Sequence, residues 1–139
     1  MKFQTGLLIL AVALLIFTFS YRATDKLGLE VKKEGKTVDD RIHFIVKNSK
    51  HVYEYQEIMK SLYNKKGDNQ EPNDVTTYYV NHVYVNGGPT VKGIGDTLLV
   101  NAKTKQVTLV SLGGDLDSTY INLSKKDSKT LISYLHLTE

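Results

Sequence analysis

The sequence predicts an α+β protein that is held to a membrane by an amino-terminal helix. Three observations carry this prediction. Residues 6–19 form an unbroken apolar run, apolar residues recur at helical spacing from Val38 to Leu62, and turn residues divide the chain beyond Val75 into short β-branched and aromatic segments. These patterns are typical of a membrane span, an amphipathic helix and an antiparallel sheet, respectively.

The apolar run is bounded by charges, since Lys2 precedes it and the next charged residue is Arg22. At about 1.5 Å per residue, a helix of this length comes close to spanning a hydrocarbon core of about 30 Å. We therefore expect residues 1–22 to be an uncleaved, single-pass signal-anchor. The alternative is a secreted protein with a cleaved signal peptide. Its best cleavage site follows Ser20, but almost no polar stretch precedes that position.

The orientation of the anchor depends on two opposing signals. A very short basic tail before an apolar run is how an export signal begins, which favours a body outside the cytoplasm. The Lys and Arg residues that follow the run favour the opposite orientation. We expect the carboxyl-terminal body to be extracytoplasmic.

The composition of the body argues against several kinds of partner and site. Lys2 and Arg22 account for two of the 18 Lys and Arg residues, so the remaining 16 nearly balance the 15 Asp and Glu residues. A nearly neutral body is a poor binder of polyanions, and we expect no nucleic-acid partner. The chain has no Cys, which excludes disulfides, thiolate metal sites and a cysteine nucleophile.

Residues 23–37 are charged and contain two glycines, so we expect a solvated tether with, at most, a short strand at Leu29–Val31. The three-four spacing that follows predicts one long helix from Val38 to Lys65. In an alternative reading, Ile42–Val46 is a strand and the helix begins at Ser49, because Asn and Ser side chains compete for backbone hydrogen bonds.

The rest of the chain predicts four strands and a closing helix, which complete a domain over residues 38–139. Tight turns between consecutive strands indicate an antiparallel meander, on which the long helix would pack. This order of elements resembles that of cystatin-like and related α+β rolls, and the likeness is one of element order only. The predicted strands are Val75–Val85, Thr97–Asn101, Gln106–Leu112 and Thr119–Leu123, and the helix begins after Ser124.

No motif in the sequence indicates catalysis. The four histidines form no His-Glu-x-x-His pattern, and no Gly-x-Ser-x-Gly elbow is present. The glycine-rich loop Gly87–Asp96 has Ile94 where a phosphate-binding loop requires Lys. We therefore expect no catalytic residue, no metal and no cofactor, although enzymatic activity stays open.

The chain contains nine Tyr residues, and tyrosine suits protein interfaces because it combines a broad apolar ring with a hydrogen-bonding hydroxyl. Three tyrosines fall on the first predicted strand, and we expect Tyr78 and Tyr84 to be exposed on one face with His82. The glycine-rich loop beside them is a further candidate for recognition. The predicted binding residues are Tyr78, His82, Tyr84, Gly87, Gly88, Lys92, Gly93 and Gly95.

These observations favour a membrane-anchored, extracytoplasmic binding or accessory module. Its partner would be another protein of a cell-envelope or secretion assembly, or a second copy of the chain. The alternative from another class is a small envelope hydrolase whose site forms only in three dimensions. A pocket that gathers His82 with an acid and a serine would favour the hydrolase.

The anchor can be tested in the cell. The intact protein should stay in the membrane fraction after an alkaline carbonate wash, because a spanning helix is held by its buried apolar surface. Immunoblotting of the washed fraction and mass spectrometry of the amino terminus check this. Recovery of a soluble form that begins near Tyr21 would show that the segment is a cleaved signal peptide.

Overall fold

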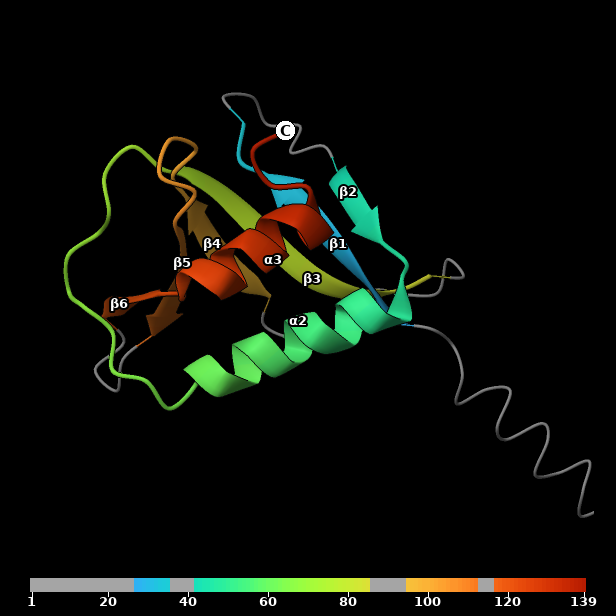
Figure 1. Ribbon diagram of the computed structural model, residues 1–139, viewed down its shortest axis with the longest axis horizontal. Helices are drawn as coiled ribbons and strands as arrows, with labels where there is room; N and C mark the ends of the chain where they lie inside the picture. Colours follow the sequence, from blue (N-terminus) through green and yellow to red (C-terminus); the bar gives the residue numbers. More distant parts are fainter. Residues whose placement is uncertain (1–26, 36–41, 86–94, 113–116) are drawn as a thin grey trace, which may run out of the picture.

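The computed structural model describes residues 27–35, 42–85, 95–112 and 117–139. Within these ranges six antiparallel strands form one sheet in the order β2-β1-β3-β4-β5-β6, and two helices cover one of its faces (Figure 1). The elements follow the chain as β1 (Leu27–Lys33), β2 (Ile42–Val46), α2 (Ser49–Leu62), β3 (Thr76–Tyr84), β4 (Asp96–Val100), β5 (Val107–Leu112), β6 (Ser118–Asn122) and α3 (Lys125–Leu135).

The predicted α+β class is confirmed, and the single long helix from Val38 is wrong. The chain is a strand over Ile42–Val46, and α2 begins only at Ser49, as the alternative reading had it. Asn48 is the reason for this boundary. Its side-chain oxygen accepts hydrogen bonds from the backbone N–H groups of Lys50 and His51, at 3.0 and 3.2 Å, which is the geometry of a helix N-cap.

The predicted four-stranded sheet is also too small. The four predicted strands are present as β3 to β6, and β1 and β2 extend the sheet beyond β3. Much of the expected tether is therefore part of the sheet. Strand β1 pairs along its whole length with β3, and its side chains Leu29 and Val31 are fully buried. A strand this short and mixed in charge is not recognisable from its own residues, because its pairing with β2 and β3 stabilises it.

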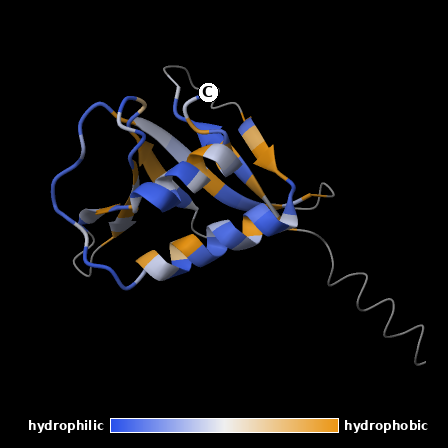
Figure 2. Cartoon of the chain, viewed as in Figure 1, coloured by the Kyte–Doolittle hydropathy of each residue, from blue (hydrophilic) through white to orange (hydrophobic). Residues whose placement is uncertain are grey.

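Both helices bury an apolar stripe against the same face of the sheet. In α2 the buried residues Val52, Tyr55, Met59 and Leu62 recur at steps of three and four, as on one side of an α-helix. In α3 the residues Ser128, Leu131 and Leu135 do the same. In Figure 2 both helices alternate between hydrophilic and hydrophobic residues along their length, and the strands behind them include hydrophobic stretches.

The segment between α2 and β3 folds over the outer edge of β6 (Figure 1). Asp68 and Tyr120 exchange two backbone hydrogen bonds of 2.8 Å, which form an isolated antiparallel bridge. Gly67 permits this approach, because a Cβ atom there would lie 2.8 Å from the Thr119 hydroxyl oxygen. The bridge occupies backbone groups of an edge strand that would otherwise be open to pairing with another chain.

Neither helix of the described residues is long and apolar enough to cross a membrane. The predicted anchor lies within residues 1–26, outside the described residues, and remains a prediction.

The packing of α2 can be tested at Leu62, whose side chain is 1% exposed. Replacing Leu62 with Ala should lower the free energy of unfolding by about 2–5 kcal/mol, because it removes buried methyl groups and leaves a cavity. Urea denaturation of Leu62→Ala checks this. The control is Lys60→Ala in the exposed part of the same helical turn, which should cost less than about 0.5 kcal/mol. Equal losses in both variants would contradict the packing of this helix.

Candidate functional site

The predicted binding residues are divided between described and undescribed parts of the chain. Gly87, Gly88, Lys92 and Gly93 lie outside the described residues, and their predicted role is untested. The described candidates are Tyr78, His82, Tyr84 and Gly95.

Tyr78 does not lie on an accessible surface, so the expectation that it is exposed is wrong. Its side chain is 1% exposed, and its hydroxyl accepts a hydrogen bond of 3.1 Å from the backbone N–H of Thr138. The ring also meets His43 edge-on, with centroids 5.6 Å apart. The alternation along β3 was assigned correctly, but the face that carries Tyr78 is the one that the helices cover.

The same face becomes accessible toward the end of β3, where His82 and Tyr84 are half-buried. The side-chain amide nitrogen of Gln56 on α2 lies 3.2 Å from Nε2 of His82, within hydrogen-bonding distance. The Tyr55 ring stands behind this pair, with its centroid 6.3 Å from that of His82. Helix α2 therefore holds the imidazole ring in one orientation.

Leu27 lies on the strand beside β3 and completes this end of the sheet. It is paired in register with Tyr84, and residues directly opposite each other on antiparallel strands point to the same face. Leu27 is 38% exposed and Tyr53, one helical turn before Gln56, is 61% exposed. We refer to Leu27, Tyr53, Gln56, His82 and Tyr84 as the His82 patch.

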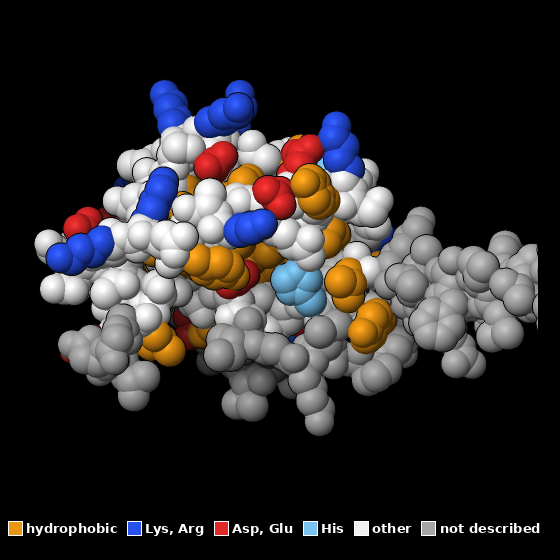
Figure 3. Space-filling view, turned by 90° about the horizontal axis from the view of Figure 1, so that it is seen from below, with side chains coloured by type: hydrophobic (Ala, Val, Ile, Leu, Met, Phe, Trp, Pro, Cys, Tyr) orange, Lys and Arg blue, Asp and Glu red, His pale blue; other side chains and the backbone are white. Residues whose placement is uncertain are grey.

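Figure 3 shows the molecule from the side of α2. One histidine is visible there, and hydrophobic side chains gather beside it toward one end of the molecule, while lysines stand out on another side. Acidic and basic side chains also stand close to the histidine in Figure 3, so the surface around it is mixed, with hydrophobic side chains on one side.

Gly95 has a structural role beside this patch. A Cβ atom at this position would lie 2.0 Å from the side-chain oxygen of Asn81 and 3.0 Å from the backbone oxygen of Val80, so a larger residue would require the Asn81 side chain to move. Its predicted role in binding stays a prediction.

The sequence does not predict a polar contact between the buried Tyr55 and the half-buried Asp96, which lies behind the patch. The Tyr55 hydroxyl donates a hydrogen bond to a carboxylate oxygen of Asp96, the first residue of β4. Burial raises the pKa of Tyr55 well above its usual value, and the negative charge of Asp96 and this hydrogen bond raise it further. From the sequence, Tyr55 is an equal candidate for the core and for an interface, and nothing in the sequence joins it to a residue 41 positions away.

The contacts of His82 do not make a catalytic set in the described residues. Asp96 is bonded to Tyr55, and among the residues that the structure describes neither a serine hydroxyl nor a carboxylate bonds to the imidazole. The described ranges also contain no group of three His, Cys, Asp or Glu residues that could hold a metal ion.

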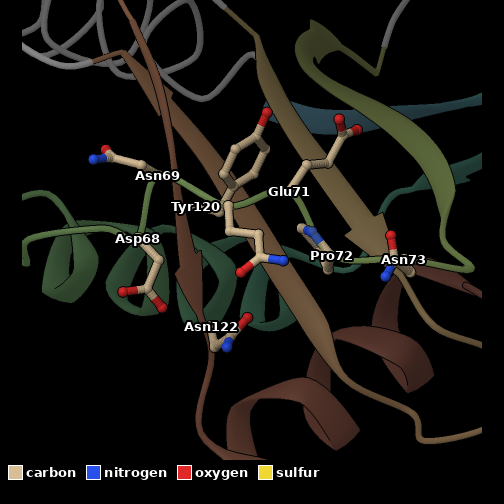
Figure 4. A pocket seen from close by; sticks show the side chains of 8 residues that line it. Asp68, Asn69, Glu71, Pro72, Asn73, Tyr120 and Asn122 are labelled. Atoms are coloured by element: carbon tan, nitrogen blue, oxygen red, sulfur yellow. The ribbon is translucent and has the colours of Figure 1, made fainter.

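The described residues also line cavities elsewhere on the surface, two of which are considered next. The larger of the two, of about 600 Å³, is an open hollow between the α2–β3 segment and side chains of β6 (Figure 4). In Figure 4 the side chains of Glu71 and Tyr120 extend to the same side, and Asp68 and Asn122 lie at the other end. Its lining is polar, with Asp68, Asn69, Gln70, Glu71, Pro72, Asn73, Tyr120 and Asn122. The second cavity, of about 400 Å³, is lined by Thr104, Lys105, Lys125, Lys129 and Ile132.

We found no match for this chain among protein-family models, curated proteins or solved structures. The site must therefore be interpreted from its own residues.

The Tyr55–Asp96 pair predicts a loss of stability at alkaline pH. The folded state keeps the Tyr55 proton to a higher pH than the unfolded chain, in which tyrosine titrates near pH 10. Above about pH 10 the unfolded state therefore binds fewer protons than the folded state, and the free energy of unfolding falls as pH rises.

Urea denaturation at several pH values between 7 and about 11 measures this dependence. The slope above pH 10 should be shallower in Tyr55→Phe than in the wild type, whereas Tyr53→Phe at an exposed position should leave it unchanged. A slope that is the same in Tyr55→Phe and the wild type would show that the Tyr55 hydroxyl is not held in its protonated form.

Proposed function

We propose that the chain is a membrane-anchored binding module that recognises a protein partner through the His82 patch, with its folded body outside the cytoplasm. The observation that carries this proposal is the set of side chains at this end of the sheet. The patch consists of two tyrosines, a leucine, an imidazole and an amide, and none of its five residues is Asp, Glu, Lys or Arg. Interface cores are enriched in such aromatic groups and poor in charges.

The scaffold under the patch favours recognition by a preformed surface. Tyr84 and Leu27 sit on paired strands, and the contact between Gln56 and His82 joins those strands to α2. Side chains that are already ordered lose little conformational entropy on binding, which favours affinity. A protein partner is favoured over a nucleic acid because the patch offers contact area without positive charge.

The predicted anchor places a further constraint on the partner. If residues 1–22 span the membrane, only four residues separate the anchor from Leu27, and an extended chain of this length covers at most about 14 Å. The patch would then face partners that are themselves held close to the membrane. This agrees with a role in an envelope or secretion assembly.

The proposal predicts that Tyr84 contributes strongly to binding. The partner is first isolated by affinity purification of the full chain from native membranes and identified by mass spectrometry. Replacing Tyr84 with Ala should then weaken its binding by at least about 2 kcal/mol, or about thirtyfold in affinity, as expected of an aromatic residue at the centre of an interface. The melting temperature and circular dichroism of the variant should stay close to those of the wild type.

Tyr63→Ala is the matched control, because Tyr63 is 68% exposed and lies beyond the opposite end of α2. It should leave the affinity unchanged. Full binding by a stably folded Tyr84→Ala variant would place the interface elsewhere. Turnover of a substrate by the purified protein, abolished in His82→Ala, would replace the binding proposal with the envelope hydrolase.

A further inference from the structure

The end of β3 extends beyond the strand that flanks it on one side. Strand β1 pairs with β3 as far as Tyr84, whereas the pairing of β3 with β4 ends where Val80 lies opposite Asp96. Residues 81–84 of β3 therefore have no described strand on their β4 side. Two of these residues, His82 and Tyr84, belong to the His82 patch, so a strand edge without a described partner borders the candidate interface.

One hydrogen bond just beyond β1 fixes the direction of the backbone groups along β3. In an antiparallel pair, residues that exchange hydrogen bonds with the residue opposite alternate with residues whose N–H and C=O groups point away. The Glu34 N–H donates to the Thr77 backbone oxygen at 2.9 Å, and the register of β1 with β3 places these two residues opposite each other. Thr77 therefore bonds to the β1 side, and so do Asn81 and Val83, which follow it by even numbers of residues.

The β4–β5 hairpin gives the same assignment independently. The Asn101 N–H donates to the Gln106 backbone oxygen at 3.0 Å, so every second residue of β4 before Asn101 faces β5. The backbone groups of the other β4 residues, Asp96 among them, face β3. Asp96 lies opposite Val80, so the backbone groups of Val80, and those of His82 two residues later, are directed to the β4 side.

The N–H and C=O groups of His82 and Tyr84 are thus directed away from β1, and we refer to these four groups as the β3 edge. Other edges of the sheet are closed or interrupted. On β6 the outward-facing Tyr120 exchanges two backbone hydrogen bonds with Asp68. On β2 the register against β1 shifts, and such irregularities hinder the pairing of an edge strand with another chain. Of these three edges, the β3 edge is the one for which the described residues provide neither device.

We propose that the protein partner adds an extended segment to the β3 edge as a further strand. This inference rests on the proposed function and specifies how the His82 patch recognises its partner. Strand residues two apart are separated by about 6.8 Å, and the backbone of another extended polypeptide presents donors and acceptors at the same spacing. Addition of a strand to a sheet edge is a recurrent mode of peptide recognition.

The patch also indicates which side chains the added segment carries. Residues of the segment opposite His82 and Tyr84 would point to the same face as those two side chains. They would meet aromatic rings there, so apolar or β-branched residues are expected at alternate positions of the segment. Backbone hydrogen bonds would then contribute affinity, and the side chains of the patch would contribute specificity.

Hydrogen exchange in the free protein tests whether the β3 edge is open. It is followed by two-dimensional NMR of the isotope-labelled full chain in detergent micelles. The amides of His82 and Tyr84 should exchange at least about tenfold faster than those of Asn81 and Val83, because only the latter are bonded to β1. Slow exchange at all four amides would show that the edge is closed without a partner and would overturn the proposal.

The same measurement on the complex separates this inference from the proposed function. The partner purified from native membranes should slow exchange at His82 and Tyr84 by at least about tenfold, through the new hydrogen bonds. Binding that Tyr84→Ala weakens, without protection of these two amides, would overturn the added strand and leave the proposed function standing. Protection of both amides together with full binding by Tyr84→Ala would support the added strand and show that the Tyr84 side chain is not the anchor.

A defined peptide tests the β3 edge without the natural partner. The probe is acetyl-Lys-Thr-Val-Thr-Val-Thr-Lys-amide, which alternates β-branched side chains and is kept soluble by its lysines. At millimolar concentration it should shift the amide signals of His82 and Tyr84 saturably. The matched control is the same peptide methylated on every internal backbone nitrogen, which keeps the side chains but lacks the donors. Equal shifts with both peptides, or no shift with either, would overturn the proposal.

Discussion

The pairing of β1 with β3 is the constraint on which the rest of the structure depends. These strands are far apart in sequence and pair along the whole of β1, which also carries β2 on its other edge. Their register sets the two faces of the sheet, because directly opposite residues point to the same side. It places Leu29 opposite His82 and Val31 opposite Val80, and a slip by one residue would turn the buried leucine and valine toward the opposite face.

This register determines both where α2 packs on the sheet and which residues form the candidate interface. The apolar stripe of the helix covers the face that β1 and β3 create together, and Gln56 meets His82 only because β3 ends beneath the same helix. Leu27 and Tyr84 are neighbours for the same reason. The proposed interface thus lies on the same face of the sheet as the core, at the end of β3 that α2 leaves partly exposed.

Polar contacts hold the connecting segments of this cysteine-free chain to its core. Tyr78 holds the carboxyl-terminal residues through Thr138, Tyr55 holds the start of β4 through Asp96, and Ser128 holds the β4–β5 turn. No buried side-chain nitrogen or oxygen of the described residues lacks a hydrogen-bond partner. Such contacts fix geometry as well as stability, since an unpaired buried polar group is costly.

The sequence by itself determined the α+β class, the strands β3 to β6 and the closing helix, because their alternation and turn residues are local signals. It also assigned the alternating faces of β3. The tertiary structure alone decided which of those faces the helices cover, and so made Tyr78 a core residue. It also decided that part of the expected tether is β1, since a short strand is recognised by its partners rather than by its own residues. The Tyr55–Asp96 pair joins distant positions, and periodicity within one segment carries no information about which other segment lies against it.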